Sequence, residues 1–87
     1  ELLESCAVEL GLSTELGKEL AVQTAYGACK LARNASESAG ELRENVTSPN
    51  GTTEAALKVF AAEEIDRIVK SAVTAARDRS IELAKGN

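Results

Sequence analysis

Histidine, tryptophan and methionine are absent from this 87-residue chain, and proline, phenylalanine and tyrosine occur once each. Without histidine the chain lacks the commonest general base, so every histidine-dependent catalytic triad is excluded. The shortage of large side chains predicts a thin core for a single copy of so short a chain. If the chain takes part in catalysis, it therefore acts by binding and positioning a reactant, or with a cofactor held elsewhere.

Cysteine is also scarce, since Cys6 and Cys29 are the only two and form no C-x-x-C pair. A disulfide scaffold uses more cysteines than this, and two thiols without histidine argue against a zinc site. Free cysteine is among the residue types that are most often buried. We therefore expect two buried structural thiols and no metal site.

The chain has neither a long apolar run nor a basic cluster. Its net charge is −4 and its Lys and Arg residues are scattered, so nothing favours nucleic acid or an anionic membrane as a partner. No stretch approaches the length of a membrane span, and no signal-peptide pattern is present, so we expect a cytoplasmic protein. Because the sequence begins abruptly in a helical pattern without Met, we expect further residues upstream.

Apolar residues recur at helical spacing along the chain, and no segment alternates as a strand does. A first helix should start near Glu1 and end at Gly11. A second should cover about residues 15–34, with Ser13 or Thr14 as its N-cap.

The second predicted helix carries a stripe of small residues, namely Gly17, Ala21, Ala25, Ala28 and Ala32. Gly17 and Gly27 each cost about 1 kcal/mol relative to Ala inside a helix. Close approach of another helix is the compensation that we expect. Small-residue stripes suit packing within or between subunits, so we expect a homodimer.

Three further helices are predicted after residue 34. Ser38 to Glu41 has the spacing of a capping box and begins a short helix that runs to about Asn45. Another helix should begin near Thr52, and its continuation should reach about residue 85. The sequence leaves open whether this last pattern breaks near Ala62. Its charged residues read as a solvated helix face with helix-spaced ion pairs. We therefore expect an all-α domain of about five helices.

The segment Val46–Thr53 contains the only proline and is the most informative part of the sequence. Ser48-Pro49 must interrupt helix, and Asn50-Gly51 supplies residues that tolerate positive φ in a tight turn. A helix then begins. Unpaired N–H groups at a helix N-terminus are suited to holding a carboxylate or a phosphate.

Hydroxyl groups surround this turn at Ser48, Thr52 and Thr53. Together with the backbone N–H groups of Gly51, Thr52 and Thr53, they form a candidate site for a carboxylate. The alternative is a purely structural connection between two helices, because turn chemistry of this kind is common.

The run from Glu41 to Leu57, ELRENVTSPNGTTEAAL, closely resembles the signature of the pyrroline-5-carboxylate reductase family, whose usual pattern is V-T/S-S-P-G-G-T/A-T followed by a helix. The Ser-Pro turn is the specific part of this resemblance. Flanking segments are similar too, so that it spans essentially the whole chain, and they include Gly11-Leu12, Gln23-Thr24, Gly27-Ala28, Lys30-Leu31, Ala72-Val73 and Glu82-Leu83.

The resemblance implies that residues 1–87 are the C-terminal helical domain of such an enzyme, which forms an interwoven dimer and supplies the substrate pocket. It implies reduction of 1-pyrroline-5-carboxylate to L-proline, the last step of proline synthesis. The N-terminal Rossmann domain that binds NADPH or NADH is absent from this chain, so we expect the chain alone to bind no cofactor and to have no reductase activity.

Carried over by position, the resemblance implies that Ser48, Gly51, Thr52 and Thr53 bind the substrate carboxylate. Thr53 matches the threonine near the ring nitrogen and is the catalytic candidate. Two departures stand out: Asn50 replaces the first of two glycines, and the Gly-Phe between the last two helices is missing. Two alternatives remain open, a stand-alone helical oligomerisation module and the helical domain of another Rossmann-type reductase.

Overall fold

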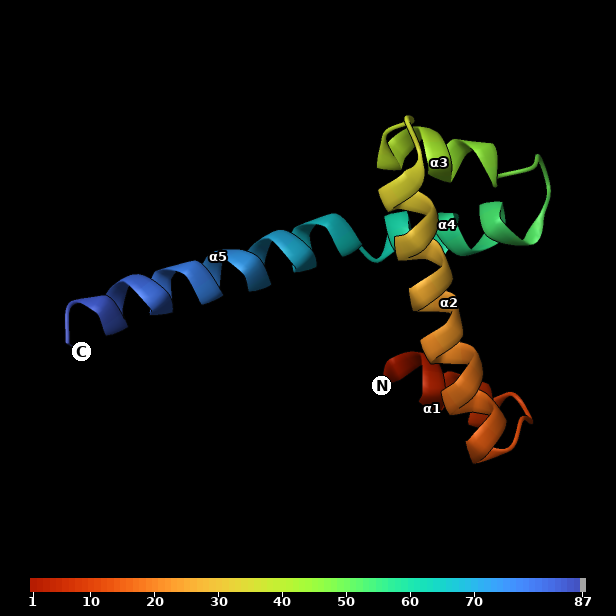
Figure 1. Ribbon diagram of the computed structural model, residues 1–87, viewed down its shortest axis with the longest axis horizontal. Helices are drawn as coiled ribbons and strands as arrows, with labels where there is room; N and C mark the ends of the chain where they lie inside the picture. Colours follow the sequence, from red (N-terminus) through yellow and green to blue (C-terminus); the bar gives the residue numbers. More distant parts are fainter. Residues whose placement is uncertain (87) are drawn as a thin grey trace. The chain divides into compact units, whose positions relative to one another are not determined.

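The computed structural model describes residues 1–86, and within them the chain forms five α-helices and no strand (Figure 1). This confirms the all-α prediction. The chain divides into two compact units, one of residues 1–45 and one that begins at Val46. The helices are α1 (Leu2–Glu9), α2 (Thr14–Asn34) and α3 (Ala39–Asn45) in the first unit, and α4 (Thr52–Ala62) and α5 (Ile65–Ala84) in the second.

The connection between α1 and α2 is built as the sequence predicts. Gly11 has a φ of 107° and ends α1 with two backbone hydrogen bonds, from its own N–H to Val8 O at 3.0 Å and from Leu12 N–H to Ala7 O at 2.9 Å. This is a Schellman motif, which satisfies carbonyl groups that the last helical turn leaves unpaired. Ser13 is the N-cap of α2, because its Oγ accepts from Leu16 N–H at 3.1 Å.

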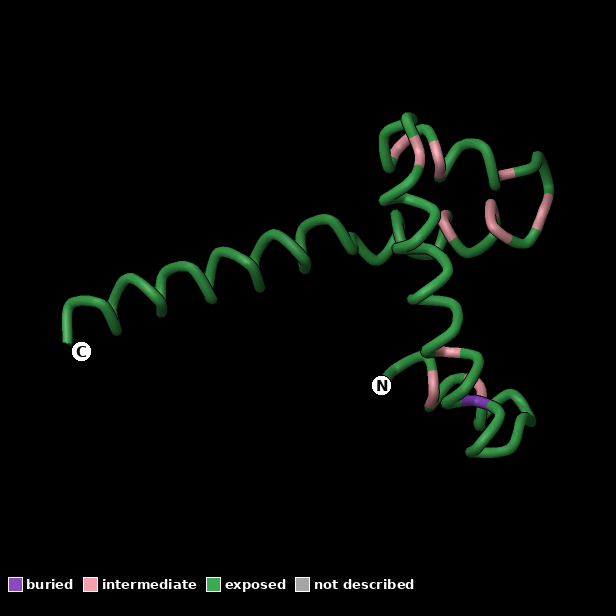
Figure 2. The backbone as a smooth tube through the Cα atoms, viewed as in Figure 1, coloured by how far each residue is buried: buried purple, intermediate pink, exposed green. Residues whose placement is uncertain are grey.

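Gly17 is where α2 meets α1, and it is the one buried residue of the described chain (Figure 2). A Cβ added at Gly17 would lie 3.1 Å from Ala7 Cβ and 3.4 Å from Glu4 O. The expected compensation for this glycine is therefore present, because a Cβ at this position would be crowded by α1. Gly27 differs, since nothing lies within 4 Å of the place where its Cβ would be.

Helix α3 begins with the predicted capping box. Glu41 N–H donates to Ser38 Oγ at 3.2 Å, and Ser38 N–H donates to Glu41 Oε1 at 3.3 Å. Each side chain thus satisfies a backbone N–H of the other residue.

The pattern from Thr52 onward does break after Ala62, which the sequence left open. Glu64 takes a left-handed conformation, with φ 57° and ψ 49°, and serves as the N-cap of α5. Few residues other than glycine adopt positive φ. A glutamate thus takes a glycine-like conformation between the last two helices, and α5 then runs until Gly86, at φ 85°, ends it.

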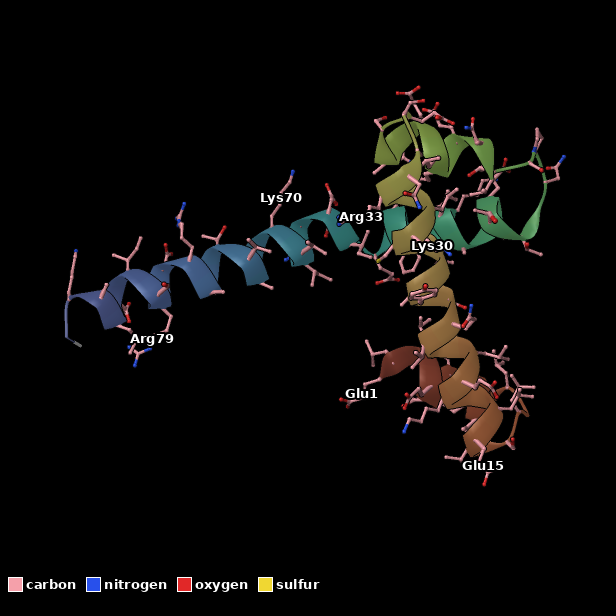
Figure 3. All side chains as sticks on the ribbon, viewed as in Figure 1. Glu1, Glu15, Lys30, Arg33, Lys70 and Arg79 are labelled. Atoms are coloured by element: carbon pink, nitrogen blue, oxygen red, sulfur yellow. The ribbon has the colours of Figure 1, made fainter. Side chains whose placement is uncertain are left out.

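Helix α5 is exposed along its whole length, and its charged residues form helix-spaced ion pairs, as predicted. Arg79 pairs with Glu82 at 2.9 Å, and Arg67 pairs with Glu64 at 3.4 Å, both at helical spacing. Figure 3 shows Lys70 and Arg79 projecting outward from this helix. Exposed pairs of this kind contribute little to stability.

Within the described residues, no apolar side chain is buried. Leu10 is 85% exposed, Val73 64% and Phe60 49%. Cys6 and Cys29 are also exposed, so the prediction of buried thiols is wrong for the chain by itself. The physical reason is that a single copy has no core in which a thiol could be buried. No described helix is long and apolar enough to cross a bilayer.

A valine at Gly17 should destabilise the α1–α2 pair, because its side chain would displace Ala7. Overpacking of this kind costs about 1–3 kcal/mol. The expected result is a lower urea midpoint for Gly17→Val. Gly40→Val is the matched control, since a Cβ there would meet its nearest neighbours at 3.8 and 3.9 Å. Equal midpoints for the two variants would show that the close approach at Gly17 does not matter.

Candidate functional site

The segment before α4 is a tight β-turn over Ser48–Gly51. Gly51 N–H donates to Ser48 O at 3.0 Å and closes the turn. Pro49 occupies the second position, where its ring fixes φ near the required value, and Asn50 occupies the third with φ 62°. Positive φ at the third position after proline is the geometry of a type II turn. Asn50 therefore replaces the family's glycine without loss of the turn.

Gly51 has a different role from the one that its sequence context suggests. Its backbone is extended, with φ −87° and ψ 179°, and it is the N-cap of α4. Glycine is favoured here because a Cβ would lie 3.1 Å from Ser48 O. The Gly51 N–H is engaged within the turn, which corrects the expectation that it is an open donor.

The first turn of α4 leaves its backbone donors open. The N–H groups of Thr52 and Thr53 precede the first possible acceptor within the helix. Gly51 has no side chain with which to cap them. Among residues 1–86, no hydrogen bond engages these two N–H groups or the hydroxyls of Ser48, Thr52 and Thr53. The turn and the start of α4 thus carry several hydrogen-bond donors that no described residue accepts from.

Exposure differs along these residues. Ser48 and Thr52 are exposed, whereas Gly51, Thr53 and Glu54 are half-buried. The aligned peptide dipoles of α4 place partial positive charge at this end, which favours a bound anion. A ligand carboxylate here could accept from the Thr52 and Thr53 N–H groups, while a threonine hydroxyl is left for a second ligand atom.

A feature that sequence reasoning missed lies one turn further along. Glu54 pairs with Lys58, with Lys58 Nζ 3.1 Å from Glu54 Oε1. The signal in the sequence is the spacing of four residues between opposite charges, which joins neighbours on a helix surface. Lys58 was not among the predicted site residues.

Elsewhere, the Ser36 hydroxyl donates to Glu37 at 2.9 Å and lowers the pKa of that exposed carboxyl, outside the turn. No group of three or more potential metal ligands occurs in the described part of the chain. The described elements also include no strand that leads into a glycine-rich phosphate turn of the kind that binds a dinucleotide.

Comparison with known proteins now decides the family. Residues 1–83 match the family described as pyrroline-5-carboxylate reductase dimerisation. The chain belongs to this family. The pyrroline-5-carboxylate reductase of Pseudomonas aeruginosa is 49% identical over 77 residues, which cover 88% of this chain and 28% of that protein. Pyrroline-5-carboxylate reductase 1 of Bacillus spizizenii is 34% identical over 84 residues, or 97% of this chain and 28% of that protein.

A solved structure agrees in fold. The crystal structure of Plasmodium falciparum pyrroline carboxylate reductase with NADP bound superposes with a TM-score of 0.86 and 32% sequence identity. The match covers 90% of this chain and 32% of that one. The chain therefore spans roughly a third or less of the length of the relatives that it matches, and it corresponds to their dimerisation domain.

The turn should tolerate glycine at position 50 but not a β-branched residue. Asn50→Gly should keep the free energy of unfolding or raise it. Asn50→Val should lower that free energy by about 1–2 kcal/mol, because a Cβ-branched side chain opposes the left-handed conformation. Urea unfolding of the two variants checks this. Equal stability of both would mean that the turn does not hold position 50 at positive φ.

Proposed function

We propose that this chain is the C-terminal dimerisation and substrate-binding domain of a reductase that converts 1-pyrroline-5-carboxylate to L-proline in proline biosynthesis. The family match over residues 1–83 carries this proposal. The turn at Ser48–Gly51 supports it, because it leaves the start of α4 open to a small anion.

In this proposal the substrate carboxylate lies at the first turn of α4. The N–H groups of Thr52 and Thr53 donate to it, and the Ser48 hydroxyl is a further donor. Gly51 contributes by its lack of a side chain, which permits the tight turn and a close approach of the ligand. Donors fixed by the backbone orient the ring before reaction, and orientation of this kind supplies a large part of an enzymatic rate.

Thr53 is proposed as the catalytic residue. By resemblance it matches the threonine near the ring nitrogen of the substrate. Reduction of a C=N bond places negative charge on nitrogen unless the imine is already protonated. A hydroxyl at that position stabilises the charge with a hydrogen bond or relays a proton to the nitrogen. Thr53 is half-buried, and no described residue forms a hydrogen bond with its hydroxyl.

The reducing equivalent comes from NADPH or NADH in the full-length enzyme, at a site outside these 87 residues. We therefore propose that the chain alone binds no cofactor and is inactive. We further propose a cytoplasmic enzyme that takes a small-molecule substrate and needs neither nucleic acid nor a membrane as a partner. The net charge of −4 and the scattered basic residues support this.

A second copy of the chain is the proposed macromolecular partner, in a homodimer or a higher assembly. The family is one of dimerisation domains, and a single copy buries no apolar side chain in its described part. An open apolar hollow of about 170 Å³ is lined by Leu3, Ala7, Gly17, Leu20, Ala21 and Thr24. Gly27 lies in α2, further along the helix than Gly17. In one copy, no atom lies within 4 Å of the place where its Cβ would be.

Loss of the Thr53 hydroxyl should impair turnover of pyrroline-5-carboxylate. In the full-length enzyme, Thr53→Ala should lower kcat/KM for this substrate on the order of 100-fold, because a donor to the reacting nitrogen is lost. The KM for the cofactor should stay unchanged. Thr53→Ser retains the hydroxyl and should retain most of the activity. Steady-state oxidation of NADPH and NADH measures kcat/KM for the substrate and KM for the cofactor in both variants.

One outcome would contradict the proposed function, and another would contradict the catalytic role of Thr53. A well-folded full-length enzyme that does not reduce pyrroline-5-carboxylate, but reduces another imine or a keto acid, would assign the domain to a different Rossmann-type reductase. Equal losses for substrate and cofactor in Thr53→Ala would indicate a folding defect in place of a catalytic role.

A bulky residue at Gly27 should weaken self-association. We expect Gly27→Leu to shift the chain toward monomer in sedimentation at micromolar concentration, because a partner helix can approach closely only at glycine. Lys18→Leu is the matched control, since it lies about 180° around α2 from Gly27 at 100° per residue. Dimer formation that is equally strong in Gly27→Leu and in the original chain would exclude this face from the interface.

A further inference from the structure

Three described helices carry glutamate at the third residue after the N-cap, namely α1 (Glu4), α3 and α4. In α3 the N-cap is Ser38 and the glutamate is Glu41, and each satisfies a backbone N–H of the other, at 3.2 and 3.3 Å. In α4 the N-cap is Gly51 and the glutamate is Glu54. The glutamate at this position thus caps the start of α3 but not the start of α4.

At α4 the glutamate forms no capping box. Gly51 N–H, which a capping-box glutamate would accept, already donates to Ser48 O at 3.0 Å. The Glu54 carboxylate instead lies 3.1 Å from Nζ of Lys58, the residue four positions later in α4. The side chain of Glu54 is 30% exposed and that of Lys58 is 75% exposed.

Without Lys58, the carboxylate of Glu54 would oppose an anionic ligand. Side chains on a helix lean toward its N-terminus, so Glu54 leans toward the open N–H groups of Thr52 and Thr53. An unpaired carboxylate there is attracted by the helix dipole and can accept from those N–H groups in place of a ligand. Its negative charge would also repel the carboxylate of the substrate.

We propose that Lys58 is a positioning residue that keeps the Glu54 carboxylate off the first turn of α4 and so keeps that turn open to the anionic substrate. This inference rests on the proposed function. The ion pair adds little to stability, as exposed pairs generally do. Its effect falls on the binding of the carboxylate, and it makes Lys58 a determinant of substrate affinity that does not touch the substrate.

The test is a double-mutant cycle in the full-length enzyme. Lys58→Gln should raise KM for pyrroline-5-carboxylate about two- to fivefold, the range expected for one charge near a helix end. Neither kcat nor KM for the cofactor should change. In a Glu54→Gln background, Lys58→Gln should have no effect, because no carboxylate remains to be held.

Two controls separate the ion pair from general effects of charge. Lys58→Arg retains a cation four residues from Glu54 and should keep the original KM. Arg67→Gln removes a cation from another helix-spaced pair, on α5, and should also leave KM unchanged. Calorimetric titration with L-proline, without cofactor, gives a second readout and should show the same order of affinities among the variants. Thermal unfolding checks that every variant is folded.

The outcomes distinguish this inference from the function on which it rests. If the original enzyme reduces pyrroline-5-carboxylate and Lys58→Gln leaves its KM unchanged, the inference fails and the function stands. If Lys58→Gln raises KM equally in the Glu54→Gln background, Lys58 acts on the substrate directly and the positioning role is wrong. If the original enzyme does not reduce this substrate at all, the proposed function itself fails.

Discussion

The fold depends on the burial of apolar surface, which the described residues of one copy leave exposed. Its helices carry leucine, isoleucine and valine at helical spacing, yet none of these side chains is buried in the described residues. Hydrophobic burial is the main favourable contribution to folding, and short helices are only marginally stable without it. The Gly17–Ala7 contact joins α1 to α2, but a contact between small residues covers little area. A second copy is the partner that the family indicates.

The candidate site, unlike the core, is formed mainly by the backbone. Pro49 and Asn50 set the turn, Gly51 closes it by a hydrogen bond to Ser48, and the open N–H groups of α4 follow. Such a site needs no histidine or buried carboxylate. It therefore suits a chain that lacks histidine and whose proposed role is to hold a small anion for chemistry supplied elsewhere.

Much of this could be predicted from the sequence, because it depends on local interactions. Gly11, Ser13 and the capping box at Ser38–Glu41 act within a few residues of themselves, and the structure confirms all three. The turn at Ser48–Gly51 was predictable for the same reason. Whether Ser48, Gly51, Thr52 and Thr53 bind substrate stays a prediction.

Other features could not be predicted, for identifiable reasons. Burial of Cys6 and Cys29 depends on what covers their helices, and periodicity does not reveal this. Glu64 at positive φ has no signal in the sequence, because glutamate rarely adopts that conformation. The engaged N–H of Gly51 follows from the type of turn, which Asn-Gly alone does not specify. The pairing of Glu54 with Lys58 was visible as a spacing, but the sequence does not say whether Glu54 forms this pair or a capping box.

The most direct test of this account is the thermal unfolding of the chain over a hundredfold range of protein concentration. If a second copy supplies the missing core, folding is linked to association, and the midpoint must rise with concentration by mass action. Dilution should lead to dissociation and loss of helix together. A cooperative transition with a midpoint independent of concentration would contradict the account, because it would show that one copy is stable without a buried apolar core.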